Sequence, residues 1–181
     1  MPMDEPFWKS KPLGEMTPAE WESLCDHCGR CCLVKLEDED SGEIFTTTVV
    51  CALYDTERGG CSDYARRFSR MPDCIDLSPG NVAAIPWLPA TCAYRLIAAG
   101  RDLPSWHPLL NGGDRGPMRE AGISVLGEVM SESAVAIEDL PGLIRRWPFM
   151  DEADEALTAD AASSGRENGK GQGSGRRRDK K

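Results

Sequence analysis

The chain has 181 residues, of which 40% are hydrophobic and 28% charged, so it can form one domain with a hydrophobic core. Its formal net charge of −9 argues against general binding to nucleic acid, and no stretch approaches the roughly 20 apolar residues that span a bilayer. The N-terminus also lacks the basic start and apolar run of a secretory signal, so we expect a cytoplasmic protein whose thiols stay reduced.

The first predicted element is a helix at "TPAEWESLC", residues 17–25. Thr17 is a suitable N-cap, a proline occupies the first helical position, and Glu20 completes a capping box. The helical spacing of apolar residues continues as far as Cys28. We therefore expect Cys25 and Cys28 to lie on one helical face.

A β-hairpin is predicted next along the chain. Residues 33–38, "LVKLED", and 43–53, "EIFTTTVVCAL", flank a turn centred on "EDSG". The second segment is rich in β-branched residues, which favour strands. The acidic residues around the turn are interpreted as a solvated loop.

Two short helices are predicted after the hairpin. One covers residues 62–71, "SDYARRFSRM", with Ser62 as its N-cap. The other covers residues 88–100, "LPATCAYRLIAAG", with Gly100 as its stop.

The last predicted elements are a strand at residues 123–130 and a short helix at 137–147 that is broken or begun near Pro141. Together the elements indicate an α+β fold: a small, irregular domain over residues 1–150, organised around a cysteine-ligated metal centre. Residues 151–181 are polar and rich in glycine and serine, so we expect a disordered tail.

The cysteines are the chemically distinctive feature of the chain. All eight lie between positions 25 and 92, and half of them fall in the eight-residue stretch "CDHCGRCC". Scattered core cysteines would not cluster in this way, so we interpret them as metal ligands. The predicted ligands are Cys25, Cys28, Cys31, Cys32, Cys51, Cys61, Cys74 and Cys92.

The spacing of these cysteines constrains how they could hold a metal. The Cys-x-x-Cys spacing occurs twice in succession, and Gly29 permits the positive φ that tight metal-binding turns use. Neighbouring side chains of an extended segment point to opposite sides, so Cys31 and Cys32 are poorly placed to bind one ion. The later cysteines come singly and are expected to fold back onto this first group. One or two four-sulfur sites are possible, and sulfur ligands suit both zinc and iron–sulfur clusters.

The polar residues near these cysteines do not identify a reaction. We expect His27 to point away from a metal held by its neighbours, and His107 to be a structural histidine in a proline-rich loop. Arg30 either offsets the charge of the thiolates or lies on the surface. No zinc-hydrolase, nucleotide-binding or serine-hydrolase motif is present, so no catalytic residue is assigned.

The stretch "CDHCGRCC", followed by "CSDYARRFSRMPDC", resembles the CxxCxxCC cysteine-cluster family, which is described as zinc- or iron-chelating. Cys61, Tyr64, Arg67 and Cys74 stand at the positions of that family's second motif. The wider sequence over residues 6–149 resembles its YcgN-like bacterial branch, whose role is uncharacterised. The resemblance implies a metal centre and does not imply a particular reaction.

Two hypotheses about function follow from the sequence. The first is a cytosolic metal-binding protein that holds zinc or an iron–sulfur cluster, in which the metal chiefly organises the fold and a protein partner is conceivable. The alternative is an iron–sulfur-dependent enzyme or electron carrier, with Tyr64, Trp106 and His107 lining its site. The acidic composition counts against a zinc-dependent nucleic-acid module.

Overall fold

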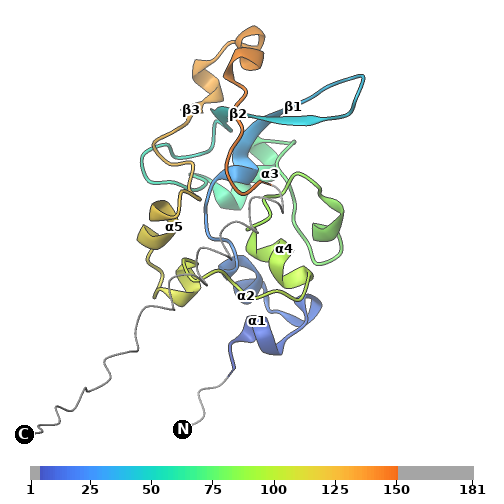
Figure 1. Cartoon of the computed structure of the whole chain (residues 1–181), viewed down its shortest axis with the longest axis vertical. Helices are drawn as coiled ribbons and strands as arrows, with labels where there is room; N and C mark the ends of the chain where they lie inside the picture. Colours follow the sequence, from blue (N-terminus) through green and yellow to red (C-terminus); the bar gives the residue numbers. More distant parts are fainter. Residues whose placement is uncertain (1–4, 151–181) are drawn as a thin grey trace, which may run out of the picture.

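In the computed structural model, which describes residues 5–150, short helices and a small sheet surround the loop that carries the first cysteines (Figure 1). The sheet lies towards one end of the molecule, and the helices α1 and α2 lie at the other end (Figure 1). The predicted α+β class is confirmed. The tail expected over residues 151–181 lies outside the described residues.

Helix α2, Pro18–Ser23, begins as the sequence predicts. The Thr17 hydroxyl accepts a hydrogen bond from the Glu20 main-chain N–H at 3.3 Å, and the Glu20 carboxylate accepts one from the Thr17 N–H at 2.8 Å. The helix ends before the first cysteine, so the prediction that Cys28 continues its face is wrong. The reason is local: His27 and Gly29 have φ values of 59° and 84°, which no right-handed helix can accommodate.

The sheet has three strands in the order β1-β2-β3. They are β1 Leu33–Glu37, β2 Ile44–Val50 and β3 Met130–Ser131. Strands β1 and β2 pair antiparallel, which confirms the hairpin, and β3 pairs parallel to β2. Of the strand predicted over residues 123–130, only the last residue belongs to a strand, because the Val125 N–H bonds to the Cys28 carbonyl at 2.9 Å instead of to a neighbouring strand.

The remaining helices are short. They are α1 Phe7–Ser10, α3 Arg67–Arg70, α4 Ala93–Ala98 and α5 Gly116–Glu120. Gly100, at φ 72°, follows α4 as predicted. Ser62 does not cap a helix, because its hydroxyl donates to the Leu53 carbonyl at 2.8 Å, and α3 is preceded by a 3-10 turn over Tyr64–Arg66. The last predicted helix is a 3-10 segment over Ile137–Leu143 that contains Pro141.

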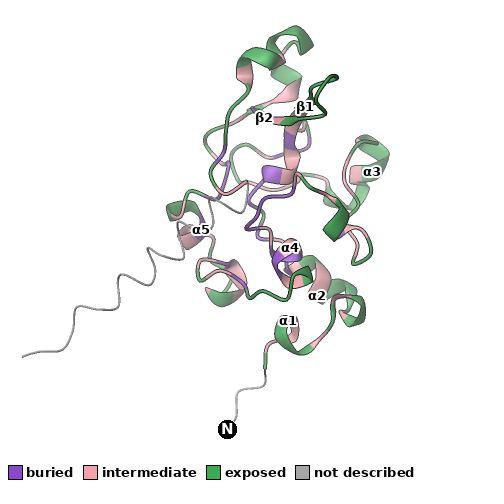
Figure 2. Ribbon diagram, turned by 45° about the vertical axis from the view of Figure 1, so that its right-hand side comes forward, coloured by how far each residue is buried: buried purple, intermediate pink, exposed green. Residues whose placement is uncertain are grey.

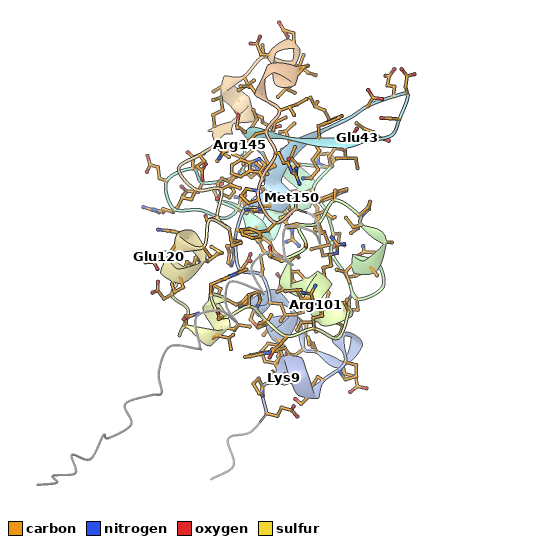
Figure 3. The ribbon with its side chains drawn as sticks, viewed as in Figure 1. Lys9, Glu43, Arg101, Glu120, Arg145 and Met150 are labelled. Carbon is orange, nitrogen blue, oxygen red and sulfur yellow. The ribbon has the colours of Figure 1, made fainter. Side chains whose placement is uncertain are left out.

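The core consists of three apolar clusters rather than one. Buried residues concentrate in the centre of the molecule and at the base of the hairpin, whereas the hairpin tip is exposed (Figure 2). Glu43 lies on this projecting hairpin, and Lys9 lies at the opposite end of the molecule (Figure 3). Leu24, Leu88 and Tyr94 belong to the first cluster. The other two clusters lie around Trp147 and around Met118.

None of the helices within residues 5–150 has the length and apolar character needed to cross a bilayer.

Candidate metal centre

Six of the eight cysteines line one cavity of about 430 Å³. They are Cys25, Cys31, Cys32, Cys51, Cys61 and Cys74. The first three come from the loop after α2 and the turn that follows it, Cys51 directly follows β2, and the last two lie on either side of α3. Three of the four later, single cysteines therefore lie around the same cavity as cysteines of the first group.

The other two cysteines do not line this cavity. Cys28 is buried against Met118 and Ile123 in the third apolar cluster. Cys92 is the residue that precedes α4 and packs against the first cluster, beside Cys25. For these two, the role of ligand stays a prediction from the sequence.

Cys31 and Cys32 occupy a 3-10 turn, Arg30–Cys32, and not an extended segment. Their side chains pack against different clusters, Cys31 on the first and Cys32 on the second. Both nevertheless line the cavity. The interaction between the two thiols lowers the pKa of Cys31 and raises the pKa of Cys32. The tight turn explains how adjacent sulfurs can face one cavity.

Main-chain N–H groups point at several of the sulfurs. The Leu53 N–H donates to the Cys51 sulfur at 3.4 Å. The main-chain N–H groups of His27 and Arg30 act on the pKa values of Cys25 and Cys28. Burial raises the pKa of both Cys25 and Cys28, and the nearby Asp26 carboxylate raises it further, while these N–H groups oppose the rise. Hydrogen bonds of this kind stabilise the thiolate that a metal requires.

Arg30 is fully buried, so of the two sequence expectations the surface arginine is wrong. Its guanidinium donates to the main-chain carbonyls of Ile123 at 2.7 Å, Gly122 at 2.9 Å and Pro148. These bonds attach the cysteine loop to two distant segments of the chain. Burial lowers the pKa of Arg30, but an arginine at this site stays charged and adds positive charge beside Cys28.

Two further cations line the cavity itself. The Lys35 ammonium donates to the Cys31 carbonyl at 3.2 Å and lies 4.2 Å from the centre of the Trp87 ring. The Arg67 guanidinium lies 3.7 Å from the centre of the Tyr64 ring. Burial raises the pKa of Cys74, and the charge of Arg67 opposes that rise. These side chains provide positive charge next to sulfurs that would be negative in a metal complex.

Two buried polar atoms beside the cysteines have no hydrogen-bond partner among the described residues. Asp26 is 5% exposed; one carboxylate oxygen accepts from the Cys28 N–H at 2.9 Å, and the other, Oδ2, has no partner. Tyr54 is 4% exposed, and its hydroxyl has no partner. Orphaned polar atoms of this kind are rare in protein interiors, and a bound ion, water or ligand beside them would satisfy them.

The two histidines match their structural interpretations. His27 is exposed and is absent from the cavity lining. His107 is fully buried; one ring nitrogen bonds to the Leu24 carbonyl at 3.1 Å, and the other accepts from the Leu109 N–H at 3.2 Å. Of the residues suggested for an enzyme site, Tyr64 lines the cavity, whereas Trp106 and His107 do not.

The donor set fits a sulfur-ligated metal centre in its chemistry. It combines clustered thiols, N–H donors to sulfur, nearby cations and two orphaned polar atoms. As they stand, no three cysteine, histidine or carboxylate side chains within residues 5–150 lie close enough together to hold a single ion. The cysteines surround a space instead of converging on a point.

This arrangement belongs to a cysteine-cluster domain. The family model described as "CxxCxxCC: Putative zinc- or iron-chelating domain" matches residues 24–93. A UPF0260 protein of Parvibaculum lavamentivorans is 54% identical over 147 residues, which is 81% of this chain and 95% of the relative. A UPF0260 protein of Mesorhizobium japonicum is 60% identical over 127 residues, 70% of this chain and 85% of the relative. The chain belongs to the UPF0260 family. No solved structure matches it.

Proposed function

We propose that this protein is a metal-binding protein whose clustered cysteines hold an iron–sulfur cluster, and that the centre mainly organises the fold. The convergence of six cysteines on one cavity is the observation that carries the proposal. All eight cysteines are free, so their sulfurs are available to bind metal.

The spread of the sulfurs favours a cluster over a single zinc ion. Zinc binds four sulfurs at about 2.3 Å, which brings them within about 4 Å of one another. The donors described here are not gathered this closely around any point, and the cavity of about 430 Å³ is far larger than one ion. A cluster of several iron and sulfide atoms fills more of such a cavity and accepts thiolates from all its sides.

An organising role follows from where the cysteines pack. Cys31 contacts the first apolar cluster, Cys32 the second, and Cys28 is part of the third. The regular elements between them are short, so they supply little cooperative structure of their own. A metal bound by these cysteines would cross-link the three clusters, and its binding free energy would become folding free energy.

The decisive experiment is purification without oxygen, followed by measurement of iron, zinc and acid-labile sulfide and of the visible spectrum. We expect a brown protein that contains iron and sulfide and whose melting temperature falls when a chelator removes the metal. A colourless protein that contains zinc would overturn the cluster and leave a structural zinc site. A protein that contains neither metal would overturn the proposal as a whole.

Single substitutions test the ligands. Replacing Cys31, Cys61 or Cys74 with serine should abolish or strongly reduce the visible absorption, because each removes a sulfur from the cavity wall. Cys28→Ser tests whether the centre also uses the sulfur next to Met118; unchanged metal content would remove Cys28 from the predicted ligands. His27→Gln is the matched control: it changes an exposed side chain between two cysteines and should leave the metal content unchanged.

A further inference from the structure

We propose that the Tyr54 hydroxyl donates a hydrogen bond to a sulfur atom of the metal centre and thereby positions that sulfur and stabilises its negative charge. This inference rests on the proposed function, because it needs a metal centre in the cavity. It assigns to Tyr54 the role of a positioning residue and not that of a ligand.

The main chain holds Tyr54 between two of the cysteines of the cavity. Its N–H donates to the Cys51 carbonyl at 2.8 Å, three residues earlier in the chain. Tyr54 also forms an isolated antiparallel β-bridge with Cys61. The residue is therefore fixed where these two cysteine-bearing segments meet.

The Tyr54 ring fixes the hydroxyl against the first cysteine loop. A Cβ atom placed on Gly29 would lie 2.8 Å from both the Tyr54 hydroxyl oxygen and its ring carbon Cε2. A Cβ atom on Gly59 would lie 3.5 Å from the same oxygen. The hydroxyl is thus closely packed between two glycines, one of which stands directly after Cys28, and it has little freedom to turn towards solvent.

The O–H of this hydroxyl has no acceptor among the described residues, although the Gly60 main-chain N–H lies near its oxygen. A buried O–H without an acceptor carries a cost that a native structure normally avoids. Tyr54 lines the cavity together with Cys31 and Cys32. A phenol keeps its proton at neutral pH, so it is a donor, whereas a metal-bound thiolate or sulfide is an acceptor.

The charges of the cysteines act directly on this group. Burial, together with negative charge on Cys28 and Cys32, raises the pKa of Tyr54 to about 12, and the Gly60 main-chain N–H opposes this rise. These sulfurs are therefore the electrostatic neighbours of the hydroxyl. Hydrogen bonds to sulfur are among the features that set the potential of an iron–sulfur centre and the affinity of a metal site.

The test compares Tyr54→Phe with Tyr64→Phe in the full-length protein. Tyr64 is the matched control because its ring lines the same cavity, but its hydroxyl already donates to the Glu22 carboxylate. The measurements are loss of metal to EDTA, the visible spectrum and reduction potential of the centre, and the melting temperature of the metal-free protein. The metal measurements are made on the protein as purified. If the purified protein contains zinc, they are repeated after titration with Zn²⁺.

For Tyr54→Phe we expect metal affinity to fall by about 10- to 100-fold, with a lower reduction potential if the metal is an iron–sulfur cluster. The metal-free variant should melt at the wild-type temperature or higher, because only an unpaired hydroxyl has been removed. Tyr64→Phe should lower metal affinity by clearly less than Tyr54→Phe does, because the hydroxyl that it removes already has the Glu22 carboxylate as its partner. A purely structural role for the Tyr54 hydroxyl would instead lower the melting temperature of the metal-free variant.

Wild-type metal affinity, spectrum and potential in Tyr54→Phe would overturn the inference and leave the proposed function intact. A lowered melting temperature of the metal-free variant would also overturn it, since the hydroxyl would then have a partner without metal. A wild-type protein that binds neither zinc nor iron would overturn both the inference and the proposed function.

Discussion

Replacing Gly29 with alanine should destabilise the metal-free protein by about 2–4 kcal/mol. Gly29 has φ of 84°, in the region that side chains disfavour, and it lies inside the cysteine loop. A Cβ atom there would lie 2.6 Å from Val125 Cγ2 and 2.8 Å from the Tyr54 ring. The substitution therefore combines backbone strain with overpacking of a buried contact.

The two contributions can be separated with a second glycine. Gly127 has the same φ of 84°, but a Cβ atom added to it would meet nothing within 4 Å. Gly127→Ala should therefore cost only the conformational part, about 1 kcal/mol. The difference between the two variants, about 1–3 kcal/mol, measures the overlap at Gly29, because carbon atoms normally stay about 3.5–4.0 Å apart.

The assay is urea unfolding of both variants with a reductant and a chelator present, followed by tryptophan fluorescence. Trp147 is 1% exposed in the described structure, so its emission should report unfolding. Equal losses of stability in the two alanine variants would refute the reasoning. That result would mean that the space between Gly29 and Tyr54 is not as closely packed as the structure has it.

Two other predictions concern buried polar groups. Arg30→Lys should lower the free energy of unfolding by about 2–4 kcal/mol in the same assay, because a lysine ammonium cannot reach all three main-chain carbonyls and leaves some of them unpaired. Arg119→Lys, on the exposed surface, is the control and should have almost no effect. Burial lowers the pKa of His107, so its contribution to stability is complete above the ordinary histidine pKa of about 6.5 and is lost as the pH falls below it. His107→Gln should weaken this pH dependence, and an unchanged dependence in the metal-free protein would show that His107 is not its source.

Helices and strands were predictable from the sequence where the residues that begin, form or end them are close neighbours in the chain. The capping box around Thr17, the β-branched strand that ends at Val50 and the glycine after α4 each act on residues a few positions away. The strand expected over residues 123–130 failed for a different reason. Its apolar residues pack against the cysteine loop, where the Val125 N–H donates to the Cys28 carbonyl. An apolar pattern of this kind suits either a strand or such a packed loop, and only tertiary contacts decide between the two.

The cysteines by themselves identified the chemistry of this protein. Their clustering within one part of the chain and the repeated Cys-x-x-Cys spacing indicated metal binding. This indication comes from the spacing alone and does not depend on knowing the fold. The absence of a second Cys-x-x-Cys pair also led us to expect the single cysteines near the first group, and three of the four line the same cavity. The spacing did not show which sulfurs share a cavity.

Only the tertiary structure decided the surroundings of the sulfurs. It placed six cysteines around one cavity and Cys28 outside the lining of that cavity. It also buried Arg30 completely and packed Tyr54 against Gly29. Nothing in the sequence singles out Tyr54, because a tyrosine between two apolar segments looks like ordinary packing. A partnerless hydroxyl becomes visible only when segments far apart in the chain close around it, since burial and hydrogen-bond partners are properties of the folded neighbourhood.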